Sequence, residues 1–407
     1  MATIGIDFGT SNTAAGVIDQ GRAKILTLEG GKDTMPTAIF LDFVNHETLY
    51  GRAAAQAMID GMDGRFMRSL KSILGTPLAR ERRQFLNERL TLIDVIARFL
   101  GEIRERAEHE NGEKFRRVLS GRPVRFHSKS DEADAQALVD LKEAYHLAGF
   151  DDVAFLPEPE AAAIAAQGSG RVLIVDIGGG TSDFTVCERS NGKTKLIASE
   201  GIRLGGTDFD RDLNIAHVMP LLGYDADIRN EMGPDFHAAP RSVFRDLATW
   251  EKIAFMYSPT LLRDVRRWER LAKDPVLFAR LGEVLEMHLG HDIAYAVEAG
   301  KIAANGSSVG IIDLKVVEKG LAAELPNHLL QMQLIDAANK IADCASATIA
   351  KAGCRPDQID RVVFVGGSSL LGVIQNRIAA LLPDAELETS EVFTAVVDGL
   401  AIASETL

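Results

Sequence analysis

Two stretches of this chain share one pattern of apolar and polar positions. In one of them, the apolar residues 172–175 lead into Asp176, three consecutive glycines at 178–180 and a further apolar run. This order predicts a strand, a tight turn and a second strand. Residues 3–18 repeat the pattern around Asp7, with a shorter glycine turn. The two aspartates are 169 positions apart (176 − 7), and repetition over such a distance indicates a duplicated structural unit.

The repeated turn has the composition of a phosphate-binding loop. Glycine lets the backbone come close to a ligand, so that its N–H groups can face phosphate oxygens. An aspartate at the end of the strand can hold a hydrated magnesium ion beside those phosphates. A single glycine-rich hairpin is more often only a turn, but two hairpins that face each other could grip a triphosphate from both sides. We therefore expect a phosphate site built from both copies.

Strands and helices alternate along most of the remaining chain. Short apolar runs predict further strands at 22–28, 37–43, 48–50, 123–126, 153–156, 194–200 and 361–365. Apolar residues at steps of three and four predict helices at 90–107 and 335–352, and capping residues or an alanine run predict helices at 130–149 and 161–166. The segment 223–292 has a mixed, mostly helical pattern. Its arginines 263, 266, 267 and 270 lie on one helix face, which is usually solvated but could dock an acidic partner.

The composition is that of an ordinary globular protein, with 46% hydrophobic and 25% charged residues among 407. A net charge of −13 argues against a nucleic-acid-binding protein, which would carry a basic footprint. No segment approaches the roughly 18 apolar residues of a membrane helix, and the N-terminus lacks the pattern of a signal peptide. The three cysteines have no zinc-site spacing. We expect a cytoplasmic protein that binds neither nucleic acid nor a membrane.

Two further glycine pairs are candidates for nucleotide contacts. Gly205 and Gly206 precede a helix, whose free N–H groups could bind an anion. Gly366, Gly367 and Ser368 join the strand at 361–365 to a helix, a common place for a nucleotide, although a turn without a ligand has the same pattern. The P-loop motif and the dinucleotide-binding glycine motif are both absent, so phosphate binding here would be of another kind.

Five motifs, taken in order, resemble the nucleotide-binding domain of DnaK-type heat-shock chaperones, a family within the actin and hexokinase-like ATPase superfamily. They are Asp-Phe-Gly-Thr-Ser-Asn (7–12), Glu-Pro-x-Ala-Ala-Ala (158–163), Asp-Ile-Gly-Gly-Gly-Thr-x-Asp (176–183), Leu-Gly-Gly-x-Asp-Phe-Asp (204–210) and Val-Gly-Gly-Ser-Ser (365–369). The resemblance implies an α/β protein with the two-lobed actin-like ATPase fold, in which duplicated ribonuclease H-like lobes surround a central nucleotide cleft. Lobe I would comprise residues 1–168 with a C-terminal helix at about 391–407. Lobe II would comprise 169–390, with a mostly helical insertion at about 223–305.

The resemblance also implies the roles of individual residues toward ATP or ADP. Asp7 and Asp176 would hold Mg²⁺ mostly through water, and Asp183 matches an aspartate associated with a monovalent ion such as K⁺. The catalytic residues would be Lys71 beside the γ-phosphate, Glu158 and Thr181. Phosphates would be bound by Gly9, Thr10, Ser11, Gly178, Gly179, Gly180, Gly205 and Gly206. Adenosine would be bound by Glu298, Lys301, Gly366, Gly367 and Ser368.

The sequence departs from the family pattern at two places. Ile302 stands where the family has an arginine that stacks on the base, and the loss of that contact, about 1 kcal/mol, predicts weaker nucleotide binding. Full-length chaperones continue into a peptide-binding domain and a helical lid, whereas this chain ends at Leu407. It resembles the shorter bacterial forms that consist of the ATPase portion.

The expected function is therefore a Mg-dependent, slow ATPase of chaperone type. Closure of its lobes would report the nucleotide state to an unidentified protein partner or client. Two alternatives stay open within the superfamily. One is a small-molecule kinase, for which no general base can be identified in the sequence. The other is an actin-like polymerising or nucleotide-sensing protein.

Overall fold

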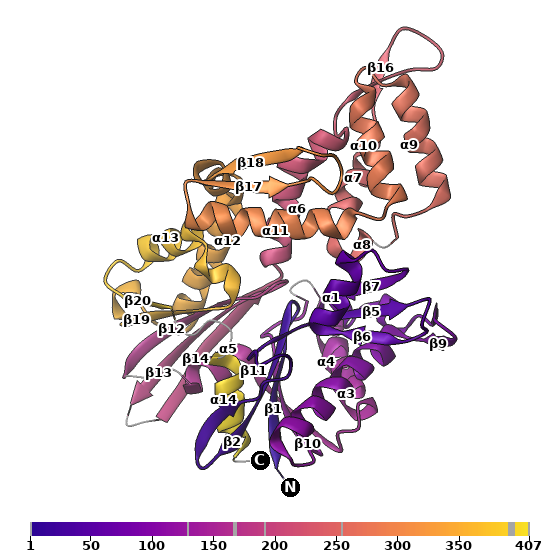
Figure 1. Ribbon diagram of the computed structural model, residues 1–407. Helices are drawn as coiled ribbons and strands as arrows, with labels where there is room; N and C mark the ends of the chain where they lie inside the picture. Colours follow the sequence, from indigo (N-terminus) through magenta and orange to yellow (C-terminus); the bar gives the residue numbers. More distant parts are fainter. Residues whose placement is uncertain are drawn as a thin grey trace. The chain divides into compact units, whose positions relative to one another are not determined.

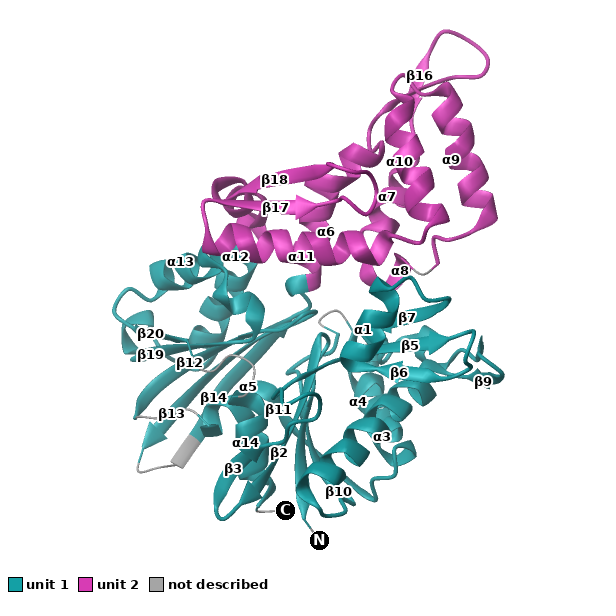
Figure 2. Ribbon diagram, in the orientation of Figure 1, with its two compact units in different colours: residues 1–206, 338–407 teal, residues 207–337 magenta. Residues whose placement is uncertain are grey.

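The computed structural model describes residues 2–127, 130–165, 169–190, 193–253, 255–389 and 395–405. The chain divides into two compact units (Figure 2). Unit 1 comprises Met1–Gly206 and Ala338–Leu407, and unit 2 comprises Thr207–Ala337. Residue 168, at the predicted lobe boundary, lies outside the described residues, as do residues 391–394 and 406–407 of the predicted C-terminal helix.

Unit 1 contains two large mixed sheets (Figure 1). The strands of the first are β1 (Thr3–Phe8), β2 (Asn12–Asp19), β3 (Arg22–Ile25), β4 (Met35–Pro36), β10 (Arg117–Arg122) and β11 (Asp152–Pro157). Its order is β11-β10-β1-β2-β3, and β4 pairs with β2. The strands of the second are β12 (Gly170–Ile177), β13 (Ser182–Ser190), β14 (Lys193–Ile202), β19 (Arg361–Val365) and β20 (Glu386–Thr389). Its order is β14-β13-β12-β19-β20.

The two sheets have the same topology, which agrees with the duplication that the sequence predicts. In each sheet, three consecutive strands form an antiparallel meander. In each, the first of these strands also pairs in parallel with a later strand, and that strand pairs in parallel with another. The carboxyl ends of the parallel strands therefore meet at one edge of each sheet, where side chains that follow the strands are brought together.

Helices and smaller strands complete unit 1. The helices are α1 (Gly51–Ile59), α2 (Pro77–Arg80), α3 (Leu92–Asn111), α4 (Asp131–Leu147), α5 (Glu158–Ala165), α13 (Gly372–Leu381) and α14 (Ala395–Ser404), with short 3₁₀ turns η1 (Leu70–Ile73), η4 (Pro356–Gln358) and η5 (Gly367–Leu370). The smaller strands are β5 (Ala38–Asp42), β6 (Thr48–Tyr50), β7 (Gly64–Arg68), β8 (Arg83–Phe85) and β9 (Glu88–Leu90). A large apolar core joins the first sheet to α3 and α4. A second core includes residues of α5, α14 and β12.

One predicted strand is displaced. The apolar pattern predicts a strand at 123–126, whereas the structure forms β10 at Arg117–Arg122. Proline has no N–H to donate to a sheet ladder, so Pro123 ends the strand rather than beginning it. The other predicted strands and helices overlap elements of the structure.

Unit 2 is mostly helical and has two small hairpins. Its elements are α6 (Gly206–Leu213), η2 (Asn214–Val218), η3 (Met219–Leu222), β15 (Asp227–Arg229), β16 (Phe236–Ala238), α7 (Arg241–Leu247), α8 (Trp250–Ile253), α9 (Pro259–Leu271), α10 (Pro275–Glu286), α11 (Gly290–Gly306), β17 (Val309–Asp313), β18 (Ala322–Pro326) and α12 (Asn327–Lys351). The first residue of α6 and the last part of α12 belong to unit 1.

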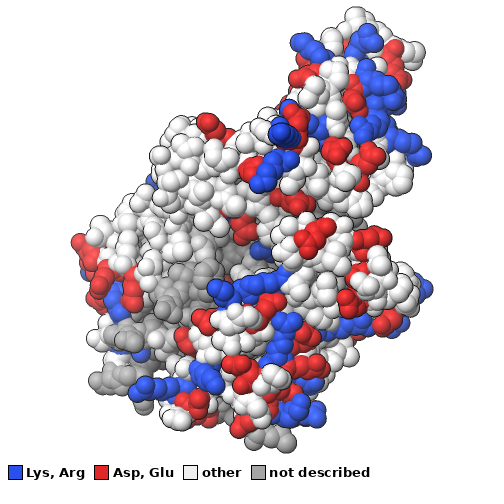
Figure 3. Space-filling view, viewed as in Figure 1, with Lys and Arg blue, Asp and Glu red and all other residues white. Residues whose placement is uncertain are grey.

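The arginines of α9 do not form a uniformly basic face. Arg266 pairs with Glu286, and Arg267 pairs with Glu231. Lys and Arg are interspersed with Asp and Glu on the face of unit 2 that Figure 3 shows. Within the described part of the chain, no helix is long and apolar enough to cross a membrane.

Candidate functional site

The first glycine turn joins β1 to β2 and is held by a third segment. A methyl group built on Gly9 would lie 2.2 Å from the backbone oxygen of Asn12, so only glycine leaves room for this turn. The Thr37 hydroxyl donates to the carbonyl oxygen of Gly9 at 2.8 Å. The Thr37 N–H donates to the carbonyl oxygen of Ser11 at 2.9 Å. The turn that carries Thr10 is thus fixed from outside its own hairpin.

The second glycine turn joins β12 to β13 and closes on itself. The N–H of Gly178 donates to the carbonyl oxygen of Thr181 at 2.9 Å, and the N–H of Gly206 donates to the carbonyl oxygen of Gly178 at 3.0 Å. A methyl group on Gly205 would lie 2.6 Å from the backbone of Gly179. The glycine pair 205–206 therefore packs directly against the turn.

The two turns lie next to each other within unit 1. A methyl group built on Gly179 would lie 2.8 Å from Ser11 Oγ and 3.2 Å from Thr10 Cβ. One on Gly180 would meet Thr10 Oγ1 at 3.8 Å. Every phosphate-binding residue predicted from the sequence is thereby brought to one place, where two backbone turns and the Thr10 hydroxyl face each other.

The third turn also belongs to this cluster. A methyl group on Gly206 would lie 2.5 Å from Ser368 Oγ. Gly366 has φ +80, and a methyl group there would lie 3.0 Å from an Asp176 carboxylate oxygen. Gly367 begins η5, directly after Gly366. The residues after β19 therefore border the second hairpin, because β19 runs parallel to β12.

Four carboxyl groups surround one lysine beside the turns. Lys71, in η1, donates from Nζ to Oε1 of Glu158 at 2.5 Å, and both side chains are buried. Electrostatic interactions link Lys71 also to Asp7 and Asp183. Asp176 lies directly opposite Asp183 in the β12–β13 ladder and interacts with Glu158 and Asp7. The structure thus assembles the predicted lysine and all four predicted carboxylates within unit 1.

Burial and mutual repulsion shift the pKa values in this cluster. Burial, with the Glu158 carboxylate, raises the pKa of Asp7 to about 7 against the opposing effect of Lys71. The same two causes raise the pKa of Asp183 to about 8. Burial and the neighbouring carboxylates raise the pKa of Asp176 well above its usual range. Burial alone would lower the pKa of Lys71, but the carboxylates around it outweigh that effect and raise it.

These residues fit a hydrated magnesium ion. Four acids facing one ammonium group leave an excess of negative charge when ionised, and a divalent cation would relieve it. Among the described residues, no three acidic, histidine or cysteine side chains are arranged to hold one metal ion directly. Magnesium commonly keeps several of its waters in proteins, so an ion at the predicted ligands Asp7 and Asp176 would be held mostly through water.

Thr181, the remaining residue predicted to be catalytic, lies directly before β13, the second strand of its hairpin. Its side chain hydrogen bonds to Asp183, which also accepts from the N–H of Val124 at 2.9 Å. The Asp183 side chain is 1% exposed and is thus held in one orientation from two sides. This aspartate is the predicted ligand of a monovalent ion.

Two of the predicted adenosine residues lie in unit 2, on α11. The Nζ of Lys301 is 2.7 Å from Oδ1 of Asp210, and both side chains are buried. Glu298 lies one turn before Lys301 on the same helix. Ile302, where the resemblance implies a lost arginine, is 64% exposed. The roles of Glu298 and Lys301 toward adenosine remain predictions.

Sequence reasoning missed two residues that shape the site. A methyl group built on Gly121, in β10, would lie 3.2 Å from the Glu158 side chain, so the missing side chain leaves room for Glu158. The same methyl group would be 3.6 Å from an Asp7 carboxylate oxygen, which is an ordinary contact. A glycine inside a strand signals such a close approach, but the displaced strand prediction at 123–126 hid it. Thr37 carried no local signal, because its role depends on contacts with residues 24 or more positions away.

Comparisons with known proteins agree with this geometry. The sequence model of the family described as "Hsp70 protein" matches residues 3–232. "Chaperone protein DnaK" of Metamycoplasma hominis is 24% identical over 420 residues, which cover 99% of this chain and 59% of that protein. "Chaperone protein DnaK" of Ureaplasma urealyticum serovar 10 is 31% identical over 214 residues, which cover 51% of this chain and 33% of that protein.

This chain therefore spans about 59%, or less, of the length of these relatives. The family match covers more than half of the chain, from the first glycine turn through the second. Together with the two sheets of like topology, it confirms the predicted two-lobed, actin-like ATPase fold. The chain belongs to the Hsp70 family.

Proposed function

We propose that this protein binds ATP with Mg²⁺, hydrolyses it slowly, and reports the nucleotide state to a protein partner. Membership of the Hsp70 family supports the coarser part of this proposal, an ATP-binding protein of chaperone type. The observation that carries the finer part is the buried Lys71–Glu158 pair, which lies among Asp7, Asp176 and Asp183 beside two facing glycine turns.

In the proposed reaction, water attacks the γ-phosphate in line with the bond that breaks, and ADP leaves. Catalysis would come mostly from positioning and charge neutralisation. The N–H groups of the glycine turns and the hydroxyls of Thr10 and Thr181 orient the phosphate oxygens. The Lys71 ammonium balances the charge that develops on these oxygens. Glu158, held by Lys71, orients the attacking water.

Cations would complete the site. Asp7 and Asp176 would hold Mg²⁺ through water, and the ion would supply further charge neutralisation at the phosphates. Asp183 would take part in binding K⁺. Glu298, Lys301 and the turn at 366–368 would bind adenosine. The protein partner or client, the absence of nucleic-acid and membrane partners, and a cytoplasmic location are parts of the same proposal.

The first test is phosphate release from purified protein with Mg-ATP. We expect slow turnover that Lys71→Ala lowers about a hundredfold while nucleotide binding persists, because the lysine acts on charge that develops in the transition state. Asp176→Asn should also lower turnover. Lys315→Ala, at an exposed lysine of unit 2, is the matched control and should leave turnover unchanged.

Three other outcomes would redirect the proposal. Tight ATP binding without phosphate release would contradict hydrolysis and favour a nucleotide-gated binding module. Stimulation of ADP formation by one metabolite would favour a small-molecule kinase, and nucleotide-dependent sedimentation would favour a polymerising protein.

A further inference from the structure

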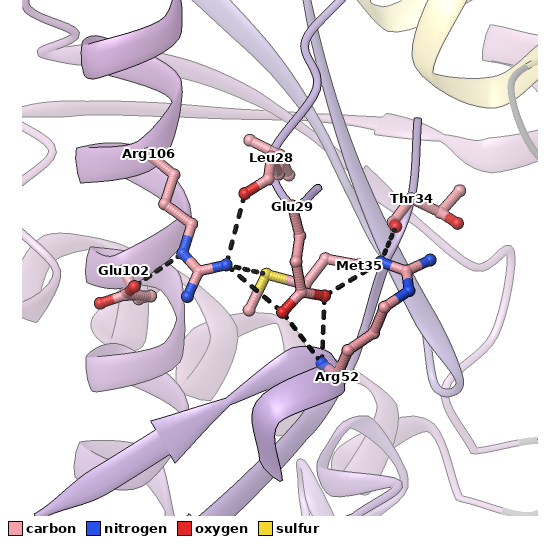
Figure 4. Close-up of polar contacts among 7 residues, drawn as sticks. All are labelled: Leu28, Glu29, Thr34, Met35, Arg52, Glu102 and Arg106. Atoms are coloured by element: carbon pink, nitrogen blue, oxygen red, sulfur yellow. Dashed lines mark hydrogen bonds and ion pairs between the residues drawn. The ribbon is translucent and has the colours of Figure 1, made fainter. Parts of the chain in front are cut away.

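A partly buried carboxylate in unit 1 joins three separate segments near the first sheet (Figure 4). Glu29 has a side chain that is only 14% exposed and receives two arginines from different helices. Arg52, at the start of α1, donates from its backbone N to both carboxylate oxygens and from Nη1 to Oε2, each at 3.0 Å. Arg106 of α3 places Nη1 3.5 Å from Oε1 and also pairs with Glu102.

The backbone of α1 is built to receive this carboxylate. Gly51, the first residue of α1, has φ +62, and a methyl group there would lie 2.7 and 2.8 Å from the two Glu29 oxygens. Any other residue would therefore push the carboxylate away from the N–H of Arg52. The negative charge also lies at the helix N-terminus, where the helix dipole favours it.

The same two arginines hold the segment that follows Glu29. Arg52 Nη1 donates to the carbonyl oxygen of Thr34 at 3.0 Å. Arg106 Nη1 donates to the carbonyl oxygen of Leu28 at 3.3 Å and to Met35 Sδ at 3.6 Å. Both ends of the loop between Leu28 and Met35 are thus attached to the pair of arginines that Glu29 holds in place.

This segment runs directly into the support of the first glycine turn. Met35 and Pro36 form β4, which pairs with Thr13 and Asn12 of β2. The next residue, Thr37, donates its hydroxyl to the carbonyl oxygen of Gly9 and its N–H to that of Ser11. A continuous chain of direct contacts therefore connects the Glu29 carboxylate with the backbone of residues 9–11.

We propose that Glu29 is a positioning residue for the first phosphate-binding turn. It holds Arg52 and Arg106, which hold the segment that ends in Thr37, and Thr37 sets the path of the backbone at Gly9 and Ser11. The proposal rests on the proposed nucleotide-binding function. Its geometric part, the order of the turn at 9–11, can be measured without any nucleotide.

The test compares Glu29→Gln with wild type in binding ATP, ADP and adenosine at a temperature well below unfolding. The variant keeps the size of the side chain but loses the charge that holds both arginines. ATP and ADP should bind about tenfold more weakly, because misplaced phosphate ligands lose their alignment. Adenosine, which has no phosphate, should bind as it does to wild type.

Amide hydrogen exchange supplies the second readout. Exchange at residues 9–13 should be faster in Glu29→Gln without ligand. The control is Glu108→Gln. Glu108 is a buried carboxylate on α3 that accepts from the backbone N of Phe115 and from Lys114. It should lower stability without changing ATP binding or exchange at residues 9–13. If Glu29→Gln does not fold, Arg106→Gln replaces it.

The proposal is overturned if ATP affinity and turn exchange stay at wild-type values, or if ATP, ADP and adenosine all weaken equally. A wild-type protein that binds no ATP would contradict the proposed function instead. The exchange measurement would then still decide whether Glu29 orders the turn.

Discussion

The two glycine hairpins of unit 1 follow one plan but are stabilised differently. The turn after β12 has three glycines and is closed by its own bond from Gly178 to Thr181, with Gly206 adding a second. The turn after β1 relies on Thr37, a residue from another segment, for two bonds. The aspartates also differ in their neighbours, because Asp176 lies opposite Asp183 whereas Asp7 lies opposite Ala14.

This difference shows that two copies of one motif can be held in place by different contacts. The second turn has one bond between its own residues besides the one that it accepts from Gly206, so local changes should damage it directly. The first turn depends on a longer chain of contacts, so changes at a distance should damage it as well.

The largest effect is expected from filling the space at the turns. Gly9→Ala and Gly205→Ala would each place a methyl group within 2.6 Å of backbone atoms that cannot move aside. Each should lower the free energy of unfolding by about 2 to 3 kcal/mol and reduce ATP affinity strongly. Urea unfolding and calorimetry measure the two effects.

Gly180→Ala is the matched control, since its methyl group would meet only the Thr10 side chain, at 3.8 Å or more. Its stability should stay within about 0.5 kcal/mol of wild type. A loss there as large as that of Gly205→Ala would show that the close approach at Gly205 is not what matters.

A smaller effect follows from the aspartate pair of the second hairpin. The pKa of Asp183 is raised from 3.8 to about 8 in the folded protein, so between these values the folded state binds more protons than the unfolded state. Stability without nucleotide or Mg²⁺ should therefore fall as pH rises toward about 8. Asp183→Asn should reduce this fall by about 1 to 2 kcal/mol, because each pKa unit corresponds to about 1.4 kcal/mol and the neighbouring carboxylates take up part of the titration.

Urea unfolding from about pH 5 to pH 9 measures how the free energy of unfolding changes with pH in wild type and in Asp183→Asn. Asp7→Asn should reduce the fall less, because the pKa of Asp7 rises only to about 7. Equal slopes in wild type and Asp183→Asn would contradict the assigned burial and repulsion at this position.

The smallest effect is expected from removing one side-chain hydrogen bond at each hairpin. Thr37→Val removes the hydroxyl that donates to the Gly9 carbonyl oxygen, and Ser182→Ala removes the one that donates to the Leu204 carbonyl oxygen. Each should cost about 1 kcal/mol of stability. ATP affinity should fall more in Thr37→Val, because the first turn depends on that contact while the second retains its own. A greater loss of affinity in Ser182→Ala would reverse the comparison.

The sequence by itself determined those parts of the protein that depend on residues close together in the chain. The alternation of apolar residues with Asp, Gly and hydroxyl residues identified both hairpins, because strand and turn preferences act between neighbours. The recurrence of one hairpin pattern far along the sequence indicated a duplication, which the like topology of the two sheets bears out. Several of the longer strands and helices were also predictable, whereas short strands such as β8, β9, β15 and β16 were not, because three residues carry no periodic pattern. The strand at 123–126 was wrong because Pro123 has no N–H for the sheet ladder and ends the strand.

Only the tertiary structure decided how distant residues meet. Lys71 and Glu158 are 87 positions apart, and the residues next to each of them give no sign of their ion pair. The roles of Thr37, Gly121 and Glu29 likewise depend on which strands become neighbours and which helices pack against them. The physical reason is that the strength of a charge interaction, and the room for a side chain, depend on how deeply a group is buried and how close its neighbours lie. Burial and these distances are set only when the chain has folded.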